Sequence, residues 1–424
     1  MELPPPPPPP PPAAGRDWSD LPADMVDIVL CKLELPDFIR AAALDLRRRG
    51  VYSFPRTPCL LYIPAAAAAN GGSSTRSAEL YCLADERPYT VTLPDPPIAE
   101  RSIVGSSRGW LVTADARSEL HLLNPATREQ IELPPIATLE QMRPILDAAG
   151  DGGDLRGYEV SFYDGDMREY RAPGIYRPDE LRDLLNIKAI LSCDPSSSSS
   201  RRRGGGGGEG GEDGCGGCIV LLIYHVYQQL SFARVGDNKQ WHWITTSSYY
   251  RSPYSDIAYR DGAFYAMNLL GGIHRYDIHH SRATRTVVLA DTLHHAYMAW
   301  TPSSGDVWRL THLPEDEEEE ELRTVGFHVY KVDFDSQDVV PIDSLGDEAL
   351  FIGHNGTFCL STKDYPALLP NHVYFTDDDE YMYDSRGARR DVGVFSLDSD
   401  SSDEIVSPQR WFNWPAPVWI MPSF

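Results

Sequence analysis

Two patterns of apolar and polar positions divide this chain. Between residues 17 and 53, apolar side chains recur at helical spacing. They predict a first helix with one apolar face, formed by Leu21, Met25, Ile28, Val29 and Leu33. Pro22 suits the first turn of that helix, and Pro36 begins a second predicted helix. Two helices this short bury too little surface to be stable alone, so their apolar faces need the rest of the chain or a partner.

From about Pro58 onward, short apolar or alternating runs rich in β-branched and aromatic residues predict β-strands separated by turns. The predicted strands are residues 59–63, 89–93, 110–113, 120–123, 219–224, 230–235, 241–244, 263–268, 272–278, 286–289, 325–334, 350–353, 372–375 and 392–397. Only residues 178–190 predict a helix in this region, with Leu181, Leu184, Leu185 and Ile187 as its apolar positions.

The predicted strands group into sets of four. Residues 256–290 hold four strands in about 35 residues, which is the size of one propeller blade. Residues 103–133 form a similar set, with Asn124-Pro125 opening its last turn. About six such sets predict a mainly β protein, a β-propeller of about six blades, with seven as the alternative. A β-sandwich stays open, but a radial array explains the regular spacing better because blades leave few exposed edges.

Several segments have compositions that cannot bury a core and are predicted to be flexible. They are the serine- and glycine-rich residues 196–217, the acidic run from Glu315 to Glu321, and the acidic, serine-rich residues 398–404. Nine prolines at residues 4–12 predict a solvated polyproline stretch. We therefore expect a disordered tail at 1–16, a helical head at 17–54 and a propeller domain at 58–424.

Composition narrows the possible partners. The chain has 424 residues, with 38 Lys and Arg against 62 Asp and Glu, so its formal net charge is −24. That charge balance argues against a nucleic-acid-binding protein, which needs a basic surface to contact phosphates. It also argues against binding to an anionic membrane surface. We expect no secretory signal, because an acidic residue and prolines follow Met1. The seven scattered cysteines are typical of reduced thiols, so we expect the cytoplasm or the nucleus.

Candidate chemistry is weak throughout. The Cys215-Gly-Gly-Cys218 spacing matches half of a zinc site, but no second ligand pair follows, which favours coincidence. The contiguous carboxylates at 315–321 and 377–380 repel each other and favour solvated loops over a cation site. No nucleophile-and-base motif is present, so we expect no catalytic residue, no metal and no cofactor. An enzyme acting on a small ligand such as a sugar remains a minor alternative.

Two parts of the sequence resemble known families. Residues 18–40 resemble the first half of an F-box, and Leu21-Pro22, Met25, Ile28 and Leu33 match its pattern. The body resembles the plant F-box-associated KIB-type β-propeller, and the closing Trp411-Phe-Asn-Trp-Pro-Ala-Pro-Val-Trp-Ile420 is its most specific block. The other matching blocks are residues 105–111, 123–125, 259–265, 353–356, 361–365, 371–375 and 391–396.

The resemblance implies a substrate-recognition subunit of a Skp–cullin–F-box ubiquitin ligase. Such a subunit performs no chemistry itself. The F-box would dock a Skp adaptor and, through it, a cullin, while the propeller would bind a protein target. The residues that would contact the adaptor are Leu21, Pro22, Met25, Ile28, Leu33 and Leu44.

One position departs from the F-box pattern. Arg48 stands where the family usually has a tryptophan, so the predicted third helix lacks its large aromatic anchor. This departure supports an alternative hypothesis, a protein-interaction scaffold that binds its target through the propeller but has a degenerate F-box and assembles no ligase.

Overall fold

The computed structural model describes residues 57–65, 75–147, 154–163, 167, 169–196, 217–237, 239–244, 253–292, 297–302, 307–314, 324–353, 356–376, 390–406 and 410–423. The chain divides into two units at residue 53, and every described residue belongs to the second unit, residues 54–423. The predicted helical head lies outside the described residues, with Arg48 and all six predicted adaptor contacts: Leu21, Pro22, Met25, Ile28, Leu33 and Leu44. The run from Glu315 to Glu321 lies outside them as well.

Seven small sheets hold the described strands. The first contains, in spatial order, β28 (Val418–Ile420), β1 (Cys59–Tyr62), β2 (Ser77–Cys82) and β3 (Arg87–Thr92). The second contains β4 (Ser102–Ser107), β5 (Trp110–Ala114), β6 (Leu120–Leu123) and β7 (Gln130–Glu132). A three-stranded sheet follows in the chain, made of β10 (Glu169–Tyr176), β9 (Leu155–Tyr163) and β8 (Met142–Leu146).

The helix α4 (Pro178–Leu185) then leads into the remaining sheets. The next contains β11 (Asn186–Leu191), β12 (Ile219–Tyr224), β13 (Gln229–Arg234) and β14 (His242–Ile244). It is followed by β15 (Tyr254–Arg260), β16 (Ala263–Asn268), β17 (Ile273–His279) and β18 (Arg282–Leu289). The following sheet has β19 (Tyr297–Trp300), β20 (Val307–Pro314), β21 (Thr324–Asp333) and β22 (Asp338–Ile342). The last sheet contains, in spatial order, β24 (Phe358–Ser361), β23 (Glu348–Ile352), β25 (His372–Thr376), β26 (Val392–Ser396) and β27 (Ser401–Asp403).

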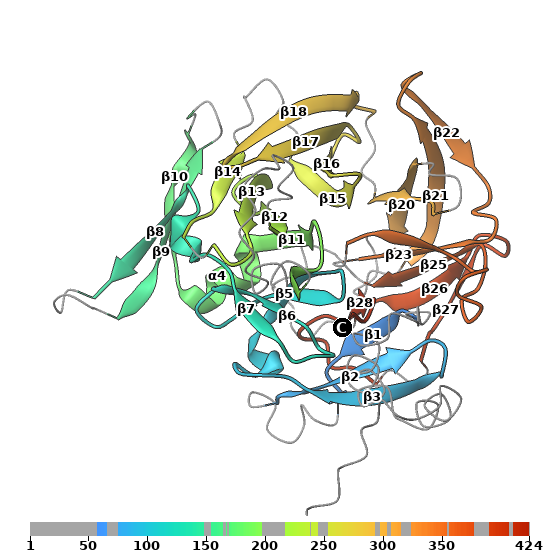
Figure 1. Cartoon of the computed structure of the whole chain (residues 1–424), viewed down its shortest axis with the longest axis horizontal. Coiled ribbons are helices and arrows are strands. Elements are labelled where there is room, and N and C mark those ends of the chain that lie inside the picture. Colours follow the sequence, from blue (N-terminus) through green and yellow to red (C-terminus); the bar gives the residue numbers. More distant parts are fainter. Residues whose placement is uncertain are drawn as a thin grey trace, which may run out of the picture. The chain divides into compact units, whose positions relative to one another are not determined.

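Six of these sheets form the blades of a β-propeller (Figure 1). Their edge strands β28, β4, β11, β15, β19 and β24 lie innermost, and each contacts the next in this order. The prediction of about six blades is therefore confirmed. The sheet of β8, β9 and β10 stands outside the ring and follows the second blade in the chain (green, at the left of Figure 1).

The two ends of this unit close the ring. β28 pairs antiparallel with β1, so that Cys59 faces Ile420 and Leu61 faces Val418. The Trp419 side chain is fully buried and meets the rings of Phe351 and Tyr374 edge to face, with centroids 5.2 and 5.8 Å apart. Edge-to-face aromatic contacts add to the free energy that burial itself provides. The C-terminal strand thereby completes the first blade by strand pairing, and one aromatic cluster packs that blade against the last one.

Two sequence-based predictions are wrong in detail. The helix predicted over 178–190 ends at Leu185, and residues 186–191 form β11, the innermost strand of a blade. All six residues of β11 are buried, and a short run buried on both faces has no periodicity that separates strand from helix. The loop predicted over 398–404 contains β27, which pairs with β26. β27 is exposed at a blade edge, where polar and charged residues are the usual composition.

A buried histidine sits in the blade formed by β15 to β18. His274 is 3% exposed, and its Nδ1 lies 2.7 Å from the Tyr254 hydroxyl, which in turn is 2.6 Å from the Tyr276 hydroxyl. Burial, aided by the positive charge of Arg285 and opposed by Asp291, lowers the pKa of His274 to about 4. The native ring therefore stays neutral at pH values where an unfolded histidine is already protonated.

We expect this histidine to make the propeller acid-sensitive. Between about pH 6.5 and pH 4 only the unfolded state takes up the proton, so the free energy of unfolding falls by about 3 kcal/mol as the pH is lowered through this window. The measurement is urea unfolding at several pH values for the wild type and His274→Gln, with His328→Gln, an exposed histidine of β21, as the control. Equal pH slopes for all three proteins would contradict the assignment.

Candidate functional site

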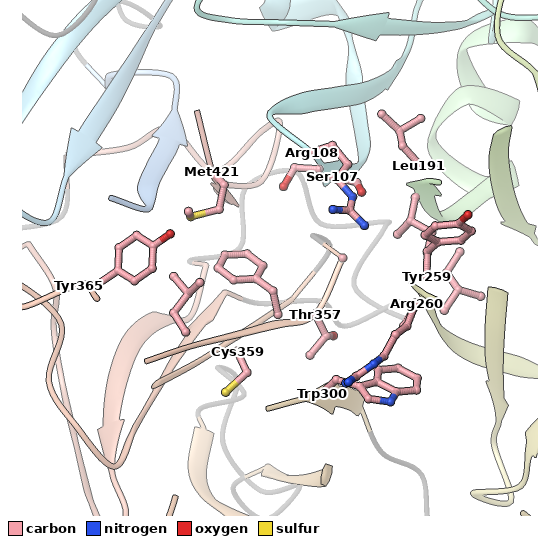
Figure 2. A pocket seen from close by; sticks show the side chains of 17 residues that line it. Ser107, Arg108, Leu191, Tyr259, Arg260, Trp300, Thr357, Cys359, Tyr365 and Met421 are labelled. Atoms are coloured by element: carbon pink, nitrogen blue, oxygen red, sulfur yellow. The ribbon is translucent and has the colours of Figure 1, made fainter. Parts of the chain in front are cut away.

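A pocket of about 460 Å³ opens where the innermost strands converge (Figure 2). Its walls come from the turn after β4, the last residues of β11 and β15, Trp300 at the end of β19, the start of β24, and Met421 just after β28. Every blade therefore supplies part of the lining. A pocket of this size accommodates one or two side chains or a small molecule.

Arg108 reaches the pocket from a tight turn between β4 and β5. Arg108 and Gly109 have φ values of +56° and +81°, the left-handed pair that two-residue hairpin turns require. The Ser423 hydroxyl donates a 2.7 Å hydrogen bond to the Arg108 carbonyl, and a β-carbon at position 109 would collide with Ser423. The C-terminal segment thus fixes the backbone that carries this arginine.

Arg260 reaches the pocket from the turn between β15 and β16. Asp261 and Gly262, with φ values of +49° and +83°, make the equivalent tight turn. The Arg260 guanidinium lies 5.8 Å from the centroid of the Trp300 ring, and its Nε lies 3.1 Å from a carboxylate oxygen of Asp261. Asp261 is 82% exposed, so water screens this ion pair and it contributes little to stability.

Beside the pocket lies a buried ion pair between two innermost strands. Lys188 of β11 and Asp256 of β15 are 5% and 0% exposed, with Nζ and Oδ1 2.6 Å apart. Lys188 also donates to the carbonyl of Gly353 at 3.2 Å, and Asp256 Oδ2 accepts from the backbone N–H of Met298 at 2.7 Å. We call these four residues the central polar cluster. It joins β11, β15, β19 and the β23–β24 connection.

The β23–β24 connection continues from this cluster into the pocket lining. The Thr357 hydroxyl lies 3.4 Å from Asp256 Oδ2, and the Gly356 N–H donates to the Ser106 carbonyl at 2.8 Å. A β-carbon on Gly356 would lie 3.1 Å from the Ile190 side chain. This connection therefore touches the innermost strands of three other blades, and a β-carbon at position 356 would require the Ile190 side chain to shift.

The Cys359 thiol, which lines the pocket, is not activated for reaction. Cys359 is buried, and its thiol faces a Glu348 carboxylate oxygen at 3.7 Å. Burial, with help from the Glu348 charge, raises the pKa of Cys359 far above its ordinary value, so the thiol stays protonated. Within the described part of the chain, no group of three or more His, Cys, Asp or Glu residues could hold a metal ion. What the described lining offers is binding by arginine, hydroxyl and aromatic groups.

The Cys215–Cys218 pair gains no support as a metal site. Cys215 lies outside the described residues. The Cys218 thiol donates to the Cys193 carbonyl at 2.9 Å, and burial raises the pKa of Cys218 to about 12. A protonated thiol that donates to the backbone is not poised as a metal ligand.

Blocks that the sequence singled out converge at the centre of the ring. The Ser106 hydroxyl donates to the Trp419 carbonyl, and the Asn124 side-chain amide donates to the Ser423 carbonyl at 3.1 Å. Asn124 also accepts from the N–H of Ala126, which closes its own turn. Sequence reasoning found these blocks but not the pocket, because its residues come from distant segments. The Asp261-Gly262 dipeptide, which is typical of a tight turn, is a signal that could have located one wall of the pocket.

Comparison with known proteins shows what this architecture is. The sequence profile described as the KIB1-4 beta-propeller matches residues 80–396, which is more than half of the chain. This chain belongs to the KIB1-4 β-propeller family. The resemblance of the body to the KIB-type propeller is thus confirmed. The family name states a β-propeller, and the structure of this chain has that fold.

Relatives of this KIB-type propeller span almost its whole length. F-box protein KIB4 of Arabidopsis thaliana is 23% identical over 420 residues, covering 92% of this chain and 94% of that protein. F-box protein SKIP23 of the same plant is 24% identical over 435 residues, covering 95% of both chains. Both relatives are named as F-box proteins.

Within the described part of this chain, no helix has the length and apolar character needed to cross a membrane.

Proposed function

We propose that this KIB-type propeller protein is the substrate-recognition subunit of a Skp–cullin–F-box E3 ubiquitin ligase. The observation that carries the proposal is the alignment with proteins named F-box proteins over more than nine tenths of both chains, together with the F-box-like pattern of residues 18–40. The head docks the Skp adaptor, which brings the cullin, and the propeller holds a protein target. The complex works in the cytoplasm or the nucleus.

The mechanism is proximity. Holding a target near a ubiquitin-loaded enzyme raises the effective concentration of its lysines, without any reacting group on the receptor. The apolar stripe of Leu21, Met25, Ile28 and Leu33 suits helix-in-groove docking on the adaptor, with Pro22 and Leu44 beside it. These six positions stay predictions, since they lie outside the described residues.

Leu21→Asp is expected to weaken adaptor binding at least a hundredfold, because it places a carboxylate in an apolar contact. The matched control is Ala23→Asp, which adds the same charge about half a helical turn away from the stripe. Titration calorimetry of the full chain with a plant Skp adaptor measures both variants. If Leu21→Asp and wild type bind equally, the head is not an adaptor-binding F-box.

The scaffold hypothesis remains the second candidate, and Arg48 is the observation that favours it. A scaffold binds its target through the propeller with no adaptor attached. Reconstituted ubiquitination separates the two: modification of a propeller-bound target by a ligase assembled on this chain excludes the scaffold. Target binding with no detectable adaptor binding by the wild type excludes the ligase subunit.

A further inference from the structure

The charge of the central pocket is opposite to that of the chain. Its charged lining residues are Arg108 and Arg260, and no carboxylate is among the described residues that line it. The chain as a whole carries a formal charge of −24. A concave site of one sign, in a surface dominated by the other, draws a ligand group of complementary charge.

Both arginines are available to a ligand. Arg108 is exposed and forms no ion pair with any described residue, and Figure 2 shows its side chain directed into the pocket. Among the described residues the ion-pair partner of Arg260 is Asp261, which is exposed to solvent, so a ligand can replace this ion pair at little cost. The planar guanidinium presents paired N–H donors that match the oxygens of a carboxylate or a phosphate.

The rest of the pocket is aromatic and apolar. Trp300 stands beside Arg260, and Tyr365 and Met421 lie on the opposite wall (Figure 2). Trp300 is held by Tyr265, whose ring centroid is 4.8 Å from its own. A ligand must therefore carry an anionic group together with apolar surface, which a free inorganic ion does not have.

The size and shape of the pocket favour a peptide segment as its ligand over the surface of a folded domain. The pocket of about 460 Å³ holds one or two side chains, and Gly356 and Thr357 obstruct the centre of the ring between β4, β11 and β15. A peptide laid across the blade turns can insert an acidic side chain between the arginines. A neighbouring apolar side chain then packs against Trp300 or Met421.

We propose that this pocket binds an acidic side chain, a carboxylate or a phosphorylated residue, within a peptide segment of the target, with Arg108 and Arg260 as its anchors. The inference rests on the proposed function in that it names the chemistry the propeller recognises. Arginine–oxyanion contacts of this type are charge-assisted hydrogen bonds, which are the strong ones among hydrogen bonds.

The test is selection from a synthetic nonapeptide library on the immobilised full-length chain. The library carries Glu, phosphoserine, Gln and Lys in equal amounts at its central position and mixed residues elsewhere. Wild type is expected to enrich Glu or phosphoserine over Gln at least fivefold, and Arg108→Gln and Arg260→Gln to abolish that enrichment. The control is Arg143→Gln, an arginine of β8 with 81% of its side chain exposed, which keeps the wild-type pattern.

Two sources of the anion are separated in the same experiment. Enrichment of phosphoserine well above Glu assigns a phosphorylated segment, and equal enrichment assigns an acidic one. If wild type shows no preference for anionic residues, or if Arg108→Gln behaves like Arg143→Gln, the proposal is wrong. Adaptor titration on the same preparations keeps this apart from the proposed function, because the pocket variants are expected to bind a Skp adaptor like wild type.

Discussion

Replacing Asp256 with alanine is expected to destabilise the propeller by about 3–5 kcal/mol, because it leaves a buried ammonium without its counter-ion. The Lys188 Nζ lies 2.6 Å from the lost carboxylate and keeps only the Gly353 carbonyl among its described polar partners. The buried N–H of Met298 loses its acceptor at the same time. An unsatisfied buried donor adds to the loss.

Urea unfolding at pH 7 measures this effect, with Asp261→Asn as the control. Asp261 also pairs with a basic side chain, Arg260, but it is 82% exposed, and asparagine tolerates the left-handed backbone of this turn, so the loss of the charge is expected to cost less than about 1 kcal/mol. The double variant Lys188→Met with Asp256→Leu removes both charges and is expected to recover most of the loss. A single-variant loss no larger than that of Asp261→Asn would show that the ion pair does not hold the blades together.

Trp419→Ala is expected to cost a similar amount, about 3–5 kcal/mol, through the cavity left in the closing blade. Trp419 is fully buried on β28, and its ring packs against Phe351 and Tyr374 of the last blade. The truncation therefore removes packing between the two blades that close the ring, while it leaves the backbone pairing of β28 with β1 in place. Unfolding should begin at this closure.

Phe412→Ala is the control for this prediction. It is an aromatic residue of the same C-terminal segment, but it is 40% exposed, so its truncation is expected to cost about 1 kcal/mol or less. Differential scanning calorimetry of both variants compares the losses, and hydrogen exchange locates them. Equal losses for Trp419→Ala and Phe412→Ala would contradict the view that β28 closes the ring through its tryptophan.

Sequence patterns predicted the blades best where a strand has one buried and one solvated face, or ends in a clear turn. The set over 256–290 is the clearest case, since its turns at Asp261-Gly262 and Gly271-Gly272 coincide with the ends of β15 and β16. The sequence predicted a helix at β11, because this strand is buried on both sides and has no alternating pattern. It predicted a loop at β27, because the residues of that strand are polar. It also missed the sheet of β8, β9 and β10, because half-exposed strands give weak apolar signals.

The pocket could not be predicted from local sequence patterns. Arg108 and Arg260 are more than 150 positions apart, and neither stands in a motif that suggests binding. Lys188 falls in the helix predicted over 178–190 and Asp256 begins the strand set predicted over 256–290, yet the two side chains form a buried ion pair. Such residues are identifiable only once the strands that carry them are known to be neighbours.

The sequence by itself determined that this chain builds small four-stranded sheets at regular spacing, because turn residues and apolar runs act over a few positions. It also carried the blocks that mark the KIB-type propeller. Tertiary structure alone decided which charges meet at the centre, because ring closure by β28 and β1 brings six distant strand ends together. The arginine-lined pocket of this acidic protein is a product of that closure.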